Sequence, residues 1–187
     1  MNRISIYSQK EPMPRELYSR LFKILEYSFP PNEHRDFEEQ YSEFKNSHFR
    51  SMVAWNGDEI AGFMNYWDLG EFVYLEHFAV AEELRGNGLG TRLLGGLHSI
   101  TENRPIILEA EPPEQSETAL RRTEFYKRLG FFLNPYEYYQ PPYRSEDSPV
   151  RLVIMSSPRG LSQQEFTMMR NALYRDAYQT DWDPSTK

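Results

Sequence analysis

The chain has 187 residues, a length that suits one domain with a complete hydrophobic core. Its 21 Lys and Arg against 28 Asp and Glu give a net charge of −7, which argues against a general nucleic-acid-binding protein, because such proteins are usually basic. There is no cysteine, so disulfides and catalysis through an acylated cysteine are excluded. The four histidines lack metal-ligand spacing, and no apolar run has the length of a signal peptide or membrane span. We therefore expect a cytoplasmic protein with no metal site and no membrane or nucleic-acid partner.

The first part of the chain predicts a strand followed by two helices. Residues 3–8 alternate as in a short edge strand. Pro14 suits a first helical position, and apolar residues at helical spacing predict a helix that ends near Ser28, before Pro30-Pro31. Aromatic residues at helical spacing predict a second helix over residues 37–44. Both apolar stripes are expected to face the core.

A run of strands leads to the middle of the chain. Asn56-Gly57-Asp58 is a strong hairpin turn, and it separates two stretches with strand character. An aromatic and apolar run ending at Val80 predicts the next strand. A helix and a short apolar strand then follow, which is the pattern of a parallel crossover. The expected elements are strands at 50–55, 59–66 and 72–80, a helix at 89–101 and a strand at 105–110.

The last third predicts a helix, two strands and a terminal helix. The helix of residues 116–129 ends at Gly130, a residue typical of a helix C-cap. Strands are expected over 131–139 and 150–155, and Ser162 with Glu165 forms a capping box that opens the terminal helix. The elements predict one α/β domain spanning residues 1–187, with a core at 50–158 and a C-terminal helix at 161–179.

The turn Arg85-Gly86-Asn87-Gly88-Leu89-Gly90 stands between the strand that ends at Val80 and an apolar helix. The first N–H groups of a helix have no internal partner, and the helix dipole is positive at that end. Glycines let a phosphate approach the backbone closely, and Arg85 adds a forked cationic donor. The turn lacks the Gly-Lys-Ser/Thr of a P-loop, and Thr91 stands where the dinucleotide fingerprint needs its third glycine.

The pattern Arg85-x-x-Gly88-x-Gly90 resembles the pyrophosphate-binding loop of the GNAT family of N-acetyltransferases. Two further segments stand in the family's order. A strand ending Phe78-Ala79-Val80 precedes the loop. A later helix ends Phe125-Tyr126-x-x-x-Gly130-Phe131, which is similar to the family's Phe-Tyr-x-x-x-Gly-Phe signature. The resemblance covers roughly residues 50–158.

The resemblance implies a fold and a co-substrate. The fold is a mixed, mostly antiparallel sheet flanked by helices and splayed at the cofactor site, here with an extra C-terminal helix. The co-substrate is acetyl-CoA, whose pantetheine arm would pair with the strand at Phe78, Ala79 and Val80. The resemblance places its pyrophosphate at the turn that contains Gly86, near Arg85, on the N–H groups of Asn87, Gly88, Leu89, Gly90 and Thr91. Ala119 and Phe125 would pack against the cofactor.

The implied activity is transfer of an acetyl group to a primary amine of a small molecule or peptide by direct attack on the thioester. The departing thiolate needs a proton. Tyr126 occupies the family's tyrosine position and is the expected general acid. The alternative is a regulatory module of the same fold that binds acyl-CoA without catalysis. A homodimer is compatible with either reading.

Glu76 is the best candidate for the base, because a glutamate within an apolar strand is costly to bury unless it has a partner or a function. The open alternative is a structural pair with an arginine such as Arg50 or Arg122. Strand alternation places His77 on the opposite face from Glu76.

Glu109 and Glu111 end the strand of residues 105–110 and could hold a cationic amine. Here the sequence departs from the family, which often has an asparagine just after this strand. The aromatic loop of residues 136–143 is expected to form a pocket wall, because acidic side chains near aromatic rings suit a cationic ligand. The other reading of this loop is a stiff hairpin tip.

Overall fold

The computed structural model describes residues 3–102 and 104–184. The chain divides into two compact units, of which the first comprises Met1–Asp68 and Leu75–Asn103 and the second Leu69–Tyr74 and Arg104–Lys187. Each unit combines antiparallel strands with helices, which confirms the predicted mixed α/β class. The expected single domain and the splaying of its sheet stay predictions.

The first unit is built on four strands in the order β1-β2-β3-β4. β1 pairs with β2, and β2 with β3, in antiparallel register. The predicted hairpin lies between β2 and β3, where Gly57 has a φ of 62°. The elements are β1 (Ile4–Ser8), α1 (Arg15–Ser28), α2 (Phe37–Ser42), β2 (Phe49–Asn56), β3 (Glu59–Asp68), β4 (Val73–Val80), whose first two residues belong to the second unit, and α3 (Leu89–Ile100).

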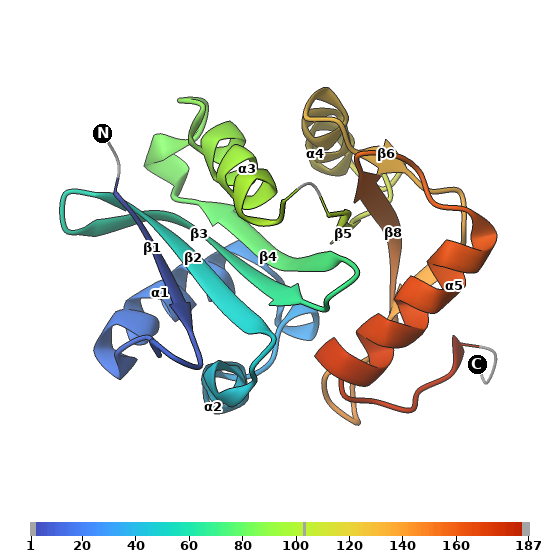
Figure 1. Cartoon of the computed structure of the whole chain (residues 1–187), viewed down its shortest axis with the longest axis horizontal. Coiled ribbons are helices and arrows are strands. Elements are labelled where there is room, and N and C mark those ends of the chain that lie inside the picture. Colours follow the sequence, from blue (N-terminus) through green and yellow to red (C-terminus); the bar gives the residue numbers. More distant parts are fainter. Residues whose placement is uncertain (1–2, 103, 185–187) are drawn as a thin grey trace. The chain divides into compact units, whose positions relative to one another are not determined.

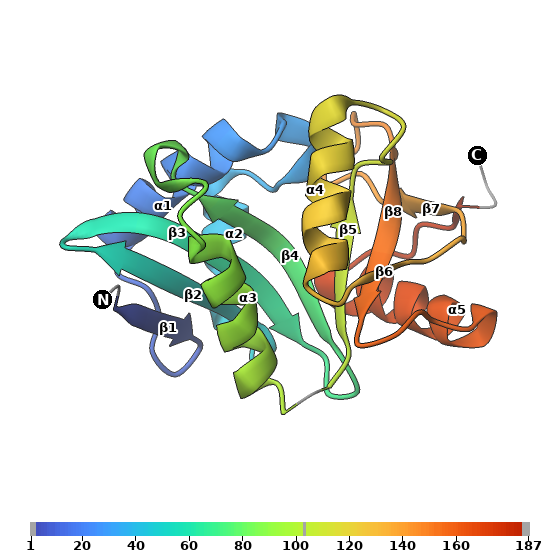
Figure 2. The ribbon, with the colours of Figure 1, turned by 90° about the horizontal axis from the view of Figure 1, so that it is seen from above.

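Helices cover both faces of these strands. α1 and α2 lie on one face and α3 on the other (Figures 1 and 2). The stripe that predicted α1 is buried, at Tyr18, Leu21, Phe22 and Leu25. Tyr18 packs its ring against Phe37 of α2, with 5.0 Å between centroids. The aromatic residues between α1, α2 and the strands therefore form the core of this unit, as the stripes predicted.

The second unit holds strands in the order β5-β8-β6, with β7 also paired to β8, and all three pairings are antiparallel. α4 and α5 lie on opposite faces of these strands (Figures 1 and 2). The capping box of α5 has both of its hydrogen bonds, as predicted. The elements are β5 (Ile106–Ala110), α4 (Glu117–Arg128), β6 (Phe132–Leu133), β7 (Tyr138–Gln140), β8 (Val150–Ser157), α5 (Gln163–Ala172) and a π-helical turn (Leu173–Ala177).

The prediction of one continuous strand over residues 131–139 is wrong, because β6 and β7 are separate short strands. Asn134 is buried at the break, and its side chain forms hydrogen bonds with backbone groups there. Its Nδ2 donates to Ile154 O at 3.1 Å, and its Oδ1 accepts from Leu161 N at 2.7 Å. Pro135 follows and has no N–H to continue the ladder.

No helix in residues 3–102 and 104–184 is long and apolar enough to cross a membrane. The cytoplasmic location and the homodimer stay predictions.

Gly62 lets β3 approach β4 closely. A Cβ built on Gly62 would lie 2.8 Å from the carbonyl oxygen of Ala79, which is a clash with backbone. We expect Gly62→Ala to lower the free energy of unfolding by about 1–3 kcal/mol in denaturant titrations. The matched control is Gly95→Ala within α3, where a Cβ meets no atom within 4 Å and helix propensity favours alanine. Equal stability of the two variants would contradict the close approach.

Candidate active site

The glycine-rich turn connects β4 to α3 through a short 3-10 helix, Glu82–Leu84. Gly86 and Gly88 have φ values of 80° and 73°, in the left-handed region that favours glycine. Gly88 is the N-cap of α3 and supplies no side-chain cap. The turn from Arg85 to Gly88 is exposed, as is Thr91, whereas Leu89 is buried and Gly90 half-buried. The structure thus gives α3 an open N-terminus that suits a phosphate group.

Arg85 folds back on this turn, where its Nε donates to the carbonyl oxygen of Val80 at 3.1 Å. Arg85 therefore lies at the end of β4 beside the exposed turn, and its role as the cation of an anion site stays a prediction. Along β4 itself, Phe78 and Val80 are half-buried while Ala79 is buried.

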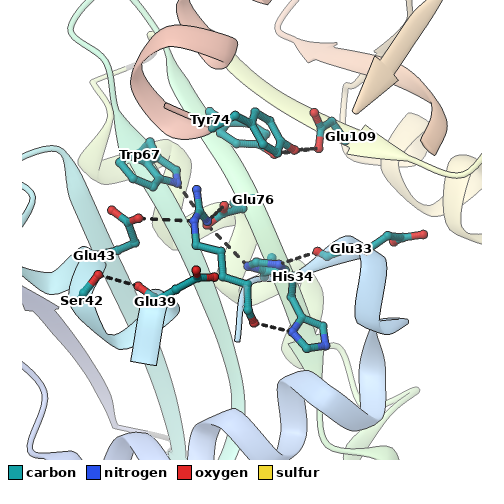
Figure 3. Close-up of polar contacts among 12 residues, drawn as sticks. Glu33, His34, Glu39, Ser42, Glu43, Trp67, Tyr74, Glu76 and Glu109 are labelled. Atoms are coloured by element: carbon teal, nitrogen blue, oxygen red, sulfur yellow. Dashed lines mark hydrogen bonds and ion pairs between the residues drawn. The ribbon is translucent and has the colours of Figure 1, made fainter. Parts of the chain in front are cut away.

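Glu76 lies in a buried cluster of charges in the first unit. Arg35 Nη1 donates to Glu76 Oε1 at 2.6 Å, and Trp67 Nε1 donates to Glu76 Oε2 at 3.1 Å. Arg35 Nε also lies 3.3 Å from Glu43 Oε1. Figure 3 shows Glu43, Trp67 and Glu76 close together; both glutamates contact the guanidinium of Arg35, and Trp67 contacts Glu76. The Glu76 side chain is only 1% exposed, so one arginine serves two carboxylates away from water.

These contacts set the charge of Glu76. Burial alone would raise its pKa, but the charge of Arg35 and the hydrogen bonds from Arg35 and Trp67 outweigh burial and hold the pKa below its ordinary value. Glu76 is therefore an ion at neutral pH. Both of its oxygens already accept a hydrogen bond.

The prediction that an arginine such as Arg50 or Arg122 pairs with Glu76 names the wrong arginines. Arg122 pairs with Glu111 at 3.0 Å, and Arg50 donates to backbone carbonyl groups. Arg35 was missed because it lies 41 residues before Glu76, in the segment after Pro30-Pro31. The sequence signal was a single arginine in an acidic segment, residues 31–44.

The expected separation of His77 from Glu76 also fails. His77 Nδ1 lies 3.6 Å from Glu76 Oε2, and His77 Nε2 lies 3.1 Å from the carbonyl oxygen of Glu33. Both side chains therefore reach the segment of residues 33–35, so simple strand alternation does not describe this part of β4. Burial lowers the pKa of His77 although Glu76 opposes the shift, which keeps the imidazole neutral at neutral pH.

Tyr126 lies in the last turn of α4, in the second unit. Its ring packs against Phe125 and Phe131, with centroid distances of 5.4 and 5.7 Å. Burial raises the pKa of Tyr126 to about 12, opposed by the charge of Arg122, so the hydroxyl is protonated at neutral pH. Ala119, in the first turn of α4, is buried, and its N–H donates to Ser116 Oγ.

Glu109 of β5 accepts hydrogen bonds from tyrosines in three separate segments of the second unit, at Tyr74, Tyr138 and Tyr178. Figure 3 shows the Tyr74 hydroxyl at the Glu109 carboxylate. The sequence singled out Glu109 and the loop that contains Tyr138. It gave no sign of Tyr74 and Tyr178, because they lie 35 and 69 residues from Glu109. No group of three His, Cys, Asp or Glu in the described ranges could hold a metal ion.

Replacing Arg35 tests the buried cluster. We expect Arg35→Met to lower the free energy of unfolding by about 3–5 kcal/mol, because it leaves two buried carboxylates without their guanidinium. The measurement is denaturant unfolding at neutral pH. The control is Arg20→Met, which removes an exposed pair with Glu59 and should cost less than about 1 kcal/mol. Similar losses in both variants would refute the central position of Arg35.

The chain matches the model of the Acetyltransferase (GNAT) family over residues 15–131. It is 34% identical over 65 residues to YjbC of Bacillus subtilis (strain 168), which is assigned to the acetyltransferases. That match spans 34% of this chain and 33% of YjbC.

Solved structures of acetyltransferases resemble this chain over most of its length. A Bacteroides thetaiotaomicron protein assigned to the GNAT acetyltransferases is 33% identical and has a TM-score of 0.84, with 96% of this chain and 99% of that chain covered. The ribosomal-protein-S18-alanine N-acetyltransferase from Escherichia coli is 20% identical with a TM-score of 0.62, covering 88% and 97%. An aminoglycoside 6'-N-acetyltransferase complexed with coenzyme A is 19% identical with a TM-score of 0.60, covering 83% and 96%. The motifs, the fold and the family match agree, and the chain belongs to the GNAT family of acetyltransferases.

Proposed function

We propose that this protein transfers the acetyl group of acetyl-CoA to a primary amine by direct attack of the amine on the thioester. The observation that carries the proposal is the exposed, glycine-built N-terminus of α3 in a chain of the GNAT family. Gly86 and Gly88 hold the turn in a conformation that directs backbone N–H groups toward an anion. This turn fits the pyrophosphate of a coenzyme A thioester.

The residues of the first unit would bind the cofactor. The N–H groups of residues 87–91 would donate to the pyrophosphate, and Arg85 would add its charge. The strand β4 would pair with the pantetheine amides along Phe78 and Val80, which are half-buried residues. Ala119 and Phe125 stay predicted cofactor contacts of the second unit. Because the Ala119 N–H is bonded to Ser116, Ala119 would contribute packing through its methyl group.

Tyr126 would act as the general acid. Its hydroxyl is protonated at neutral pH, because burial raises its pKa to about 12. Its ring is held by Phe125 and Phe131, so the position of the hydroxyl is fixed by packing. A proton transferred from this oxygen would convert the departing thiolate to a thiol.

The contacts of Glu76 support the structural alternative over the role of base. A general base needs a pKa near the working pH and an available lone pair. The pKa of Glu76 is lowered, and both carboxylate oxygens accept hydrogen bonds from Arg35 and Trp67. We propose that Glu76 fixes β4 and supplies a constant negative charge, while the amine reacts in its neutral form.

An amine acceptor is supported by the names of the structural relatives. The coenzyme A complex is an aminoglycoside N-acetyltransferase, and the Escherichia coli relative is an N-acetyltransferase of a protein alanine. Their identities to this chain are 19% and 20%, so they share the fold and do not identify the acceptor.

Thermal unfolding with added ligands tests cofactor binding. A ligand that binds only the folded state raises the midpoint in proportion to the logarithm of its concentration over Kd. Acetyl-CoA and CoA should each raise the midpoint, and NAD should not. Gly88→Val should abolish the shift, because a β-branched residue strains a φ of 73° at the N-cap of α3. Gly57→Val, in the β2–β3 turn at a φ of 62°, is the matched control and should keep the shift. No shift of the wild type at saturating acetyl-CoA would refute the proposed cofactor.

Tyr126→Phe separates an acetyltransferase from a module that only binds acyl-CoA. The variant keeps the packed ring and loses the acidic proton. We expect kcat for thiol release to fall by about 10²–10⁴-fold, the usual contribution of general acid catalysis, with unchanged affinity for CoA. Tyr136→Phe is the control, since its hydroxyl donates to the carbonyl oxygen of Leu161 at 3.1 Å. Unchanged turnover in Tyr126→Phe would remove Tyr126 from the mechanism.

A further inference from the structure

The helix α4 carries four cationic side chains, and they differ in burial. Arg121, Lys127 and Arg128 are exposed, whereas Arg122 is half-buried. Arg122 stands four positions before Tyr126 in the same helix, and side chains four positions apart are neighbours on a helix surface. Arg122 is therefore the cation of α4 that shares a helix face with the Tyr126 side chain.

An ion pair holds the guanidinium of Arg122. Its Nη1 donates to Oε2 of Glu111, the residue that follows β5, at 3.0 Å. The contact joins the end of β5 to the face of α4 that carries Tyr126. The side chains of Arg122 and Glu111 are 39% and 30% exposed, so water screens their charges only in part. Arginine does not lose its proton in proteins, and this face of α4 therefore keeps a positive charge at every working pH.

The hydroxyl of Tyr126 is poorly matched to a thiolate as a proton donor. Burial raises the pKa of Tyr126 to about 12, whereas an ordinary thiol has a pKa of about 8.5. Proton transfer from this hydroxyl to a thiolate is therefore uphill, and a group that stabilises the phenolate form would bring the two pKa values closer. The charge of Arg122 acts in that direction, since it opposes the effect of burial on the pKa of Tyr126.

We propose that Arg122 assists acetyl transfer by stabilising the negative charge that develops on the Tyr126 oxygen as the hydroxyl gives up its proton. This inference rests on the proposed acetyl transfer and adds a residue to it. Arg122 acts through Tyr126, so it is a positioning residue in this reaction.

The proton balance of the step closes. The O–H bond of Tyr126 breaks as an S–H bond forms on the departing sulfur, and the electron pair stays on the tyrosine oxygen. The acetylated nitrogen releases one proton to water, and water returns one proton to the phenolate. Each turnover therefore consumes no net proton, and the Tyr126 oxygen is negative only between these two transfers, when the charge of Arg122 stabilises it.

The competing explanation is that Arg122 serves only to tie α4 to the end of β5. A partly exposed ion pair contributes little to stability, so its loss should leave the fold intact. A structural role would also affect the protein whether or not position 126 carries a hydroxyl. The two explanations therefore differ in how substitutions of Arg122 and Tyr126 combine.

A double-mutant cycle makes this comparison, using thiol release from acetyl-CoA with the best acceptor of a primary-amine panel. We expect Arg122→Met to lower kcat by about three- to thirtyfold with unchanged affinity for CoA, because a nearby opposite charge moves a pKa by about one to three units and part of that shift appears in the rate. Arg122→Lys keeps the charge and should restore most of the loss. Added to Tyr126→Phe, Arg122→Met should lower kcat no further, since no hydroxyl is left to assist.

The ionisation of position 126 gives a readout that does not depend on turnover. Fluorotyrosine in place of Tyr126 adds a fluorine NMR signal and lowers the pKa of the phenol, which brings its titration to a milder pH. We expect Arg122→Met to raise the pKa of this phenol by about one unit or more. The matched control is Arg121→Met on the exposed side of α4, where Arg121 pairs with Glu117. It should change neither this pKa nor kcat.

Unchanged thermal midpoints, with and without CoA, show that each variant is folded. Arg122→Gln removes the charge but can still donate to Glu111, and it replaces Arg122→Met if that variant is unstable. An unchanged pKa at position 126, or an equal loss of kcat from Arg122→Met with and without Tyr126→Phe, would overturn the inference. Normal thiol release by an Arg122→Met variant would refute the inference alone, whereas no thiol release by the wild type with any amine would refute the acetyl transfer itself.

Discussion

The first unit depends on the ion pair between Arg35 and Glu76. Arg35 lies in the segment between α1 and α2, and Glu76 lies in the middle of β4, so the pair ties the helical layer to the strand that leads into the glycine turn. Glu43 also contacts the guanidinium of Arg35, and Trp67 of β3 donates to the second oxygen of Glu76. A buried carboxylate is tolerated only with such compensation, since desolvation opposes the charge. The same compensation lowers the pKa of Glu76 and makes it a weak proton acceptor.

The glycine-rich turn differs from this ion pair, because it leaves the first backbone N–H groups of α3 without a side-chain cap. Gly88 caps α3 without a side chain, and its left-handed φ turns the chain sharply from β4 into the helix. A serine or aspartate at this position would bond to the first N–H groups of α3 and compete with a phosphate. Ser116 caps α4 and Ser162 caps α5 through their side chains, whereas α1, like α3, begins without a side-chain cap. Glycine at the N-cap therefore leaves the first N–H groups of α3 without a side-chain partner.

In the second unit, polar side chains meet at Glu109. Their chemical type differs from that of the groups that contact Glu76 in the first unit. Hydroxyls of Tyr74, Tyr138 and Tyr178 donate to this carboxylate. Hydroxyl donors leave the negative charge of a carboxylate in place, whereas a guanidinium cancels it. Glu76 accepts from a guanidinium and an indole, and Glu109 accepts from tyrosine hydroxyls.

Local sequence determined most of the elements and the glycine-rich turn, because helix stripes, the hairpin at Gly57, the capping box at Ser162 and the turn from Arg85 to Gly90 depend on residues close together in the chain. It also determined the family, because the Phe125-Tyr126 signature stands in fixed order with that turn. Only the tertiary structure decided the partners of the carboxylates. Arg35 replaced the expected arginines, and Tyr178 reached Glu109, because contacts over 41 and 69 residues leave no local pattern. The break at Asn134 was hidden for the same reason, since its amide bonds to Ile154 and Leu161 across the fold.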